Sequence, residues 1–277
     1  MVAEKPEEKK QKDEMSFFDH LDVLRKHIIR GIISVILFAI AAFFFKHILF
    51  DEILFAPKDA GFITNDLLCR LGEYLEITAL CINEKKIALI NFEVAGQFSA
   101  HIVVSLVAGF IAAFPYVMHQ LWRFIRPALQ KKERRYTRGM LFVTSLLFFV
   151  GVLFGYFLIV PLTINFLSNY EVSAQLEDMY NFRNYISLVT TIALSTGLVF
   201  ELPVLIYFLS KIGIMTPMVL KKYRRHAFVL TFIVSGIITP PDVFSQILVA
   251  LPLYFLYEMS ISISKKVYRK QQRAMAG

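Results

Sequence analysis

The stretch of sequence that decides the fold is a basic segment followed by a long apolar one. Residues 123–138 read RFIRPALQKKERRYTR and hold seven Lys and Arg, whereas residues 139–160 read GMLFVTSLLFFVGVLFGYFLIV and hold no charge. A helix needs about 20 apolar residues to cross the hydrocarbon core of a bilayer, so residues 139–160 suffice. Basic loops resist translocation, and we therefore expect residues 123–138 to stay in the cytoplasm.

The same alternation extends over the whole chain. Twenty-four of the 30 Lys and Arg residues lie in four polar stretches, at residues 5–30, 123–138, 211–225 and 265–273. With 56% hydrophobic residues, the chain would expose too much apolar surface to remain soluble in water. The net charge of +8 flanks the apolar runs and does not gather on one polar domain, so nucleic acid is not expected as a partner.

Six apolar runs predict an all-α, polytopic membrane protein with six transmembrane helices, of which the fifth and sixth are short. The runs are residues 28–45, 97–118, 139–160, 185–210, 227–239 and 243–264. Residues 227–239 would reach only about 20 Å as a helix, against a hydrocarbon core of about 30 Å. This span implies either a locally thinned bilayer or a re-entrant hairpin, and we expect two full crossings.

Six crossings place both termini in the cytoplasm. Residues 1–15, rich in Lys and Glu, are expected to form a disordered tail, residues 16–268 the membrane domain, and residues 269–277 a cytoplasmic C-terminal tail. Residues 46–96 are expected to form an external cap between the first two helices. No Ala-x-Ala site follows the first apolar run, which is expected to remain as an uncleaved anchor.

The external segment contains one helical pattern. Leu67, Leu71, Tyr74 and Leu75 recur at helical spacing and predict a short amphipathic helix. Such a helix either caps the bundle, which we favour, or lies on the outer membrane surface.

The two cysteines of the chain, Cys69 and Cys81, both lie in this external segment. An oxidising exterior would permit a disulfide between them. A continuous helix would hold them about 18 Å apart, beyond the bridging limit of about 7 Å, so a bridge requires a bend near Gly72 or Ala79. The alternative is two separate buried thiols.

Glu201 is the polar residue that stands out within the apolar runs. It lies near the middle of the fourth run, where a carboxyl group is costly and usually faces a cavity or a partner. Pro203 frees the carbonyl of Val199 and favours a bend beside this carboxyl group. We expect a functional site in the bundle interior, the alternative being a protonated Glu that bonds to a neighbouring helix.

Motifs typical of catalysis and of metal or cofactor binding do not occur in the sequence. There is no His-Glu-x-x-His, Gly-x-Ser-x-Gly, glycine-rich phosphate loop or Cys-His ligand cluster. We therefore expect a protein that is not an enzyme and that has no catalytic residues, no metal and no cofactor.

Several longer motifs point to one family. They are His20-Leu21-x-x-Leu24-Arg25, Ala56-Pro57, residues 122–129 (WRFIRPAL) with Glu133-Arg134-Arg135, Phe200-Glu201-Leu202-Pro203, and residues 239–246 (TPPDVFSQ). Together they closely resemble the TatC family, which provides the large six-span subunit of the twin-arginine protein translocase. The resemblance extends over about residues 15–268.

The resemblance implies a receptor. Such a subunit binds signal peptides with a paired arginine at the cytoplasmic face of the bacterial inner membrane, and it recruits single-span partner subunits of the TatA and TatB type. Folded proteins then cross the membrane, driven by the proton motive force. The resemblance also implies homo-oligomers within the complex and contact with membrane lipids. Two guanidinium groups require carboxylates placed for bidentate hydrogen bonds.

By the same resemblance, Glu133 is the principal acid that contacts the signal peptide. Phe124, Pro127 and Arg135 shape its loop, and Arg25 belongs to the N-terminal motif at the same site. Without the resemblance, this strongly basic loop would be interpreted as a topology signal that binds anionic lipid.

One position departs from the family pattern. The family usually places a Glu immediately before Leu24, where this chain has Val23. Asp22 is turned by about 100° along the helix, whereas Asp19 lies one turn earlier on the same face as Val23. The second acid of the site is therefore Asp19 or Asp22.

The remaining matches assign four further residues. Glu201 corresponds to the intramembrane acid that faces a concave cavity, Pro57 shapes the external cap, and Thr239 and Gln246 form a polar patch that contacts partner helices. A Gln that faces lipid is costly, and a partner's polar group would satisfy it. The alternative is a hydrogen bond within the hairpin of the fifth and sixth helices.

Two other functions remain open from the residues themselves. A proton-coupled secondary transporter would use Glu201 in a midplane site, but it predicts an internal repeat that the two halves of the chain do not show. A membrane insertase would require a polar groove open to lipid.

Overall fold

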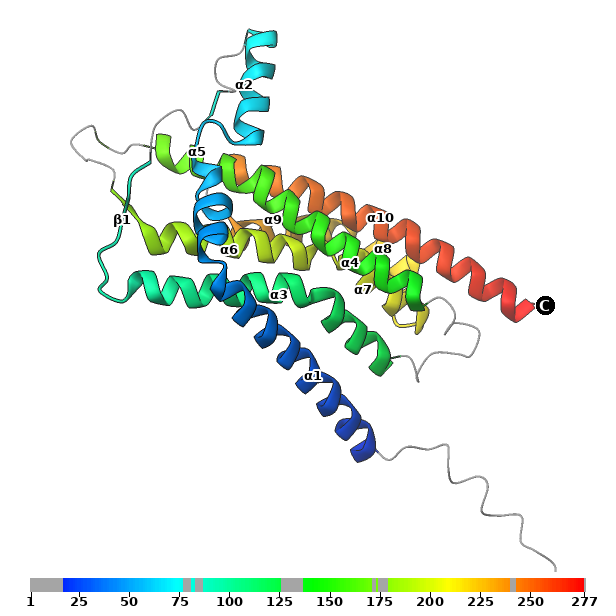
Figure 1. Ribbon diagram of the computed structural model, residues 1–277. Coiled ribbons are helices and arrows are strands. Elements are labelled where there is room, and N and C mark those ends of the chain that lie inside the picture. Colours follow the sequence, from blue (N-terminus) through cyan, green and yellow to red (C-terminus); the bar gives the residue numbers. More distant parts are fainter. Residues whose placement is uncertain are drawn as a thin grey trace, which may run out of the picture.

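The structure is a computed structural model that describes residues 17–76, 81–82, 87–125, 137–170, 173, 179–239 and 243–276. Most of these residues are helical. The predicted tail at residues 1–15 lies outside the described residues. In chain order, the elements are α1 (Phe17–Phe44), η1 (Ile48–Leu54), η2 (Ala56–Lys58), α2 (Ile63–Leu75), β1 (Leu89–Ile90), α3 (Gly96–Ile125), α4 (Thr137–Phe154), η6 (Gly155–Ile159), α5 (Val160–Asn169), β2 (Tyr180–Asn181), α6 (Phe182–Val199), α7 (Leu202–Lys211), α8 (Pro217–Lys222), α9 (Arg224–Ile238) and α10 (Val243–Ala276). α3, α4, α6 and α10 run in roughly the same direction, whereas α1 leaves the bundle at an angle (Figure 1).

The bundle has two different ends (Figure 1). One end, here called the basic end, carries the start of α1, the C-terminal ends of α3 and α10, and α8. The other, here called the cap end, carries α2, β1 and β2. The described parts of the four basic stretches all lie at the basic end. The fold therefore gathers at one end the charges that the sequence places on one side of the membrane.

Five helical segments are long and apolar enough to cross a membrane: Leu21–Phe44, Gly96–Ile125, Gly139–Asn169, Phe182–Lys211 and Gln246–Arg273. The all-α membrane fold predicted from the sequence is therefore confirmed. The sixth predicted span is α9, whose 15 residues make it shorter than a bilayer core.

The expectation of a short sixth helix is wrong. α10 has 34 residues, because the helix continues beyond its apolar run into the basic stretch at residues 265–273. Water can solvate the charged side chains there, so the end of the apolar run does not end the helix. Of the last two helices, only α9 is short.

Glycines allow the spanning helices to approach closely. A Cβ on Gly109 of α3 would lie 2.5 Å from the backbone nitrogen of Ala39 in α1. A Cβ on Gly155 of η6 would overlap Oγ1 of Thr196 in α6. Small residues at helix crossings are typical of membrane proteins, where packing must replace the hydrophobic effect.

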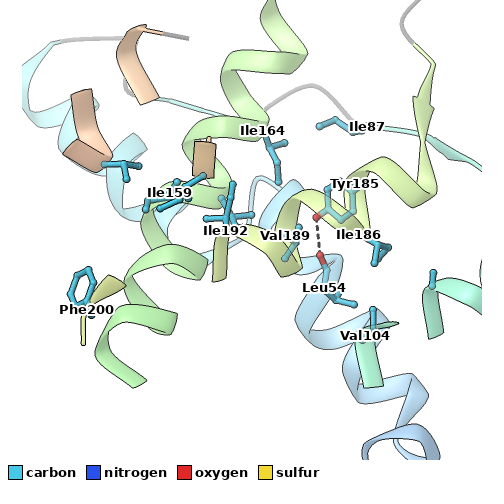
Figure 2. Packing of buried hydrophobic residues seen from close by; sticks show 14 of the residues in the cluster. Leu54, Ile87, Val104, Ile159, Ile164, Tyr185, Ile186, Val189, Ile192 and Phe200 are labelled. Carbon is cyan, nitrogen blue, oxygen red and sulfur yellow. Dashed lines mark hydrogen bonds between the residues drawn. The ribbon is translucent and has the colours of Figure 1, made fainter. Parts of the chain in front are cut away.

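The largest group of buried apolar side chains lies toward the cap end. Residues from η1, α3, η6, α5 and α6 meet there, as Figure 2 shows. The hydroxyl of Tyr185 on α6 donates to the carbonyl of Leu54 on η1 at 2.8 Å (Figure 2). This bond fixes the π-helical segment that follows α1 against the bundle.

The cap contains a short parallel pairing that the sequence did not predict. Leu89 of β1 pairs with Tyr180 of β2, and Ile90 pairs with Asn181. Next to this pairing, Arg183 and Glu93 form an ion pair at 2.8 Å. The pairing joins the segment before α3 to the segment before α6.

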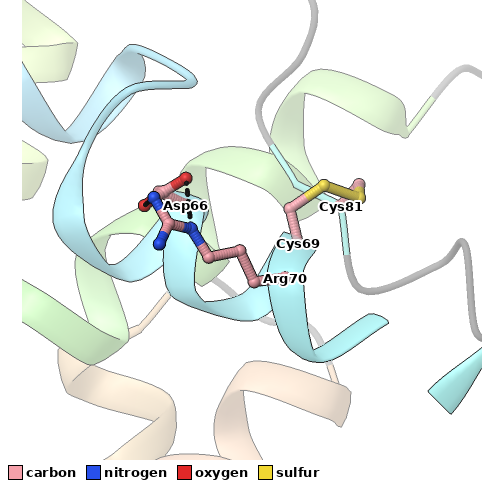
Figure 3. Close-up of a disulfide and its surroundings, with 4 residues drawn as sticks. All are labelled: Asp66, Cys69, Arg70 and Cys81. Carbon is pink, nitrogen blue, oxygen red and sulfur yellow. Dashed lines mark hydrogen bonds and ion pairs between the residues drawn. A yellow bond between two sulfur atoms is a disulfide. The ribbon is translucent and has the colours of Figure 1, made fainter. Parts of the chain in front are cut away.

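The predicted helix of the external segment is present as α2, and a disulfide joins Cys69 to Cys81 (Figure 3). The chain does not bend near Gly72, because α2 continues through it to Leu75. The turn is made instead at Glu76, whose φ of 58° is left-handed and closes the helix end. The other expected bend, at Ala79, lies outside the described residues.

Candidate functional site

At the basic end, α1 and α3 are joined by one polar contact. His27 Nδ1 and Gln120 Oε1 lie 2.7 Å apart, and Gln120 is only 4% exposed. The ring of His27 also lies 6.4 Å from that of Phe124, one turn further along α3. The structure therefore brings Phe124, which the sequence assigns to the site, against the first helix.

Asp19 and Asp22, the acids predicted on α1, precede His27 by about one to two turns, and Arg25 precedes it by about half a turn. Asp22 and Arg25 are both exposed, and Val23 between them is half-buried. Asp19 lies in the first turn of α1, and its side chain is not described. Glu133, Pro127 and Arg135 lie outside the described residues.

His27 and Gln120 were not singled out from the sequence. The available signal was a polar amide just beyond the apolar run at residues 97–118, followed by Leu121, Trp122 and Phe124. An amide in that position must find a partner or remain unpaired at a cost of about 1–3 kcal/mol. Its partner lies 93 residues away in the chain, which no local pattern reveals.

Glu201 lies at a break between two helices. α6 ends at Val199, α7 begins at Leu202, and Pro203 occupies the first turn of α7. The backbone N–H of Glu201 bonds to the carbonyl of Leu198 at 3.1 Å, a tighter turn than that of an α-helix. The bend expected beside this carboxyl group is therefore present.

The carboxyl group of Glu201 is buried, and within the described part of the chain neither oxygen has a hydrogen-bond partner. The backbone of Phe148 on α4 lies near it. Thr144, one turn before Phe148, is fully buried, and its hydroxyl also has no partner among the described residues. The carboxyl group of Glu201 and the hydroxyl of Thr144 are thus two buried polar groups without a hydrogen bond among the described residues.

Thr239 and Gln246 lie on the hairpin of α9 and α10. Gln246 Nε2 donates to the carbonyl of Phe232 at 2.9 Å, and Ser235 Oγ donates to the carbonyl of Gln246 at 2.5 Å. The hydroxyl of Thr239 donates to the carbonyl of Ser235 at 2.9 Å. The amide of Gln246 is thus bonded within the hairpin, which was the alternative to a contact with a partner.

Pro57 lies in η2 and is buried in the cap. Its carbonyl accepts a hydrogen bond from Nδ2 of Asn65 on α2 at 3.3 Å, and the same nitrogen donates to the carbonyl of Asp59 at 2.8 Å. Pro57 thus helps to hold α2 in place. Among the described residues, no three His, Cys, Asp or Glu side chains are grouped so that they could hold a metal ion.

Comparison with known proteins identifies the family. The family described as Sec-independent protein translocase protein (TatC) matches residues 19–252. The TatC protein of Blattabacterium sp. subsp. Periplaneta americana (strain BPLAN) is 38% identical over 95% of this chain and all of its own length. That of Aquifex aeolicus (strain VF5) is 34% identical over 93% of this chain and 98% of its own.

The fold agrees with a solved structure. The crystal structure of a protein described as the twin-arginine translocase receptor TatC superimposes with a TM-score of 0.69 at 35% sequence identity, and the match covers 90% of this chain and 99% of that one. A second crystal structure of this receptor, in the detergent DDM, matches with a TM-score of 0.70. The chain therefore belongs to the TatC family and is a multi-pass membrane subunit of the Sec-independent, twin-arginine protein translocase.

Proposed function

We propose that this chain is the signal-peptide receptor of the translocase and binds paired-arginine signal peptides at its basic end. The observation that carries the proposal is the hydrogen bond between His27 and Gln120, which holds Phe124 of α3 beside His27 in the third turn of α1. The solved relative described as a receptor supports it. Binding requires no covalent step, so the subunit acts without catalysis.

The chemistry of the site is the capture of two guanidinium groups. Glu133 supplies the principal carboxylate, and Asp19 or Asp22 supplies the second from α1. Arginine is preferred to lysine because its planar fork donates two parallel hydrogen bonds to one carboxylate. Arg25 and Arg135 flank these acids, and their positive charge keeps the site close to anionic lipid headgroups.

The basic end faces the cytoplasm of a bacterial inner membrane in this proposal, with both termini on that side. The support is the concentration of Lys and Arg at one end of the bundle. A membrane-impermeant thiol reagent should modify Glu133→Cys only after the inner membrane is made permeable. Modification in intact spheroplasts would contradict the orientation.

Partner subunits bind at the hairpin of α9 and α10 in this proposal. α9 is short and exposes Ile233 and Ile237, so a single-span helix can pack there while Thr239 and Gln246 lie nearby. The short helix would also thin the bilayer where partners and further copies of this subunit gather. The proton motive force would drive transport, with Glu201 as the group that responds to it.

Direct binding tests the receptor role. A labelled paired-arginine peptide is titrated against the full chain in nanodiscs, with a paired-lysine peptide as the ligand control. Glu133→Ala should weaken binding at least about tenfold, because a hydrogen bond to a charged group contributes about 1.5–3 kcal/mol. Glu76→Ala, which removes an exposed acid at the cap end, should leave the affinity unchanged. Undiminished binding by Glu133→Ala would refute the proposal.

A further inference from the structure

The helix α2 exposes an apolar face that no described part of the chain covers. Leu67 is 57% exposed, Leu71 is 45% exposed and Tyr74 is 84% exposed. Ile63 and Leu75 extend the same face at the two ends of the helix. Five large apolar side chains on a 13-residue helix imply that this face meets something other than water.

One hydrogen bond shows in which direction this face points. Thr64 Oγ1 donates to the carbonyl of Phe157 on η6 at 2.5 Å. At about 100° per residue, Leu71 and Leu75 point within about 20° of the direction of Thr64. The Leu71 and Leu75 edge of the apolar face is therefore turned toward the spanning part of the bundle, whereas Ile63 and Tyr74 point about 80–100° away from it.

The same contact fixes the depth of α2. Phe157 lies three residues before the end of the apolar run at residues 139–160 and 18 residues beyond its start at Gly139, a separation of about 27 Å of helix. The hydrocarbon core is about 30 Å thick. Since α2 contacts the bundle at Phe157, it lies at about the level at which the hydrocarbon core ends.

The helix extends sideways from this contact. α2 lies across the long axis of the bundle and projects past the edge formed by α5 and α10 (Figure 1). Its other side is polar: Arg70 forms an ion pair with Asp66 at 2.9 Å (Figure 3), and Glu73 is exposed next to them. A helix with one apolar and one charged side, oriented in this way, matches an interfacial helix.

We propose that α2 is an in-plane membrane anchor whose apolar face inserts into the leaflet at the cap end. The bound surface is phospholipid, with acyl chains against Leu67, Leu71 and Leu75 and headgroups around Tyr74. Leu153, one turn before Phe157, is 52% exposed on the lipid-facing side of α4, so the apolar face of α2 continues an existing lipid-facing surface.

Depth measurements on spin labels test this proposal. Nitroxides are placed on Leu71→Cys and Glu73→Cys of the full chain in nanodiscs that hold one copy each, without reductant, so that the disulfide protects Cys69 and Cys81. Power saturation compares access to oxygen, which concentrates in lipid, with access to a water-soluble nickel chelate. We expect the oxygen-to-nickel ratio to be several-fold higher at Leu71 than at Glu73.

Two outcomes would overturn the proposal. Equal ratios at both positions would place α2 in water, and a Leu71 label shielded from both reagents would mean that protein covers this face. A second pair of variants guards against distortion by the label and carries the nitroxide on Tyr74→Cys. In this background, Leu67→Asp should lower the oxygen-to-nickel ratio. Arg70→Asn, on the polar side of α2, should not lower it. An unchanged ratio in Leu67→Asp would also count against insertion.

Discussion

The imidazole of His27 and the amide of Gln120 form a hydrogen bond of 2.7 Å that ties the first helix to the second span at the basic end. α1 packs against α3 at Gly109 and Ala39, and toward its N-terminus it leaves the rest of the bundle (Figure 1). This bond therefore sets the distance between the N-terminal motif and the end of α3, and with it the width of the proposed signal-peptide site.

Replacement of Gln120 by Leu should weaken signal-peptide binding by about fivefold, because one hydrogen bond contributes about 1 kcal/mol. Peptide titration in nanodiscs measures the change. His119→Ala alters an exposed neighbour on the same helix and should leave the affinity as it is. Equal affinities for the wild type and Gln120→Leu would show that the hydrogen bond between His27 and Gln120 does not shape the site.

Gly109→Ala should destabilise the crossing of α1 and α3 by about 1–3 kcal/mol, since the new methyl group would overlap the backbone of Ala39. Thermal unfolding in detergent measures this loss. Gly31→Ala is the matched control, because a Cβ there meets nothing within 4 Å and the change favours helix. A loss of stability in Gly31→Ala as large as that in Gly109→Ala would contradict the packing argument.

Glu201→Leu should raise the free energy of unfolding by about 1–3 kcal/mol and reduce transport. The substitution removes a buried carboxyl group that has no hydrogen-bond partner among the described residues. Glu258→Leu is the control: it removes a carboxylate that forms an ion pair with Arg224, and it should not raise stability. Thermal unfolding measures the stability, and transport of a reporter cargo measures the activity. A Glu201→Leu variant that is less stable than the wild type would contradict the expected gain in stability.

Gln246→Leu should reduce co-purification of the single-span partners. The side chain of Gln246 bonds to Phe232, so the variant also removes a bond within the hairpin. Ser235→Ala separates the two effects, because it removes a different bond of the same hairpin while the amide of Gln246 remains. We expect Ser235→Ala to retain its partners, and retention by both variants would exclude Gln246 from the contact.

The sequence predicted the spans well because lipid imposes a long apolar run on any helix that crosses it. It predicted their ends less well. The first run begins at residue 28, whereas α1 begins at Phe17, and the last run ends at residue 264, whereas α10 continues to Ala276. Helical hydrogen bonds persist where the side chains reach water, so the end of an apolar run marks the bilayer and not the helix terminus.

The candidate site was accessible from the sequence only in part. Phe124 and Glu201 were assigned to it through motifs, and these assignments stay predictions, whereas the break of the fourth span beside Pro203 is present and follows from the missing N–H of proline. The partners of buried groups could not be predicted, because His27 and Gln120 come from helices far apart in the chain. Family membership favours the translocase subunit over the proton-coupled transporter and the insertase that the residues alone left open.

The pairing of β1 with β2 has a consequence for how the protein is made. Its neighbouring ion pair joins Glu93 to Arg183, 90 residues later, so the ribosome must deliver α3, α4 and α5 to the insertion machinery before the cap can close. Contacts of such large sequence separation form late and slowly. Nascent chains arrested before β2 should therefore expose Leu89 and Ile90 to protease, and release of the arrest should restore protection.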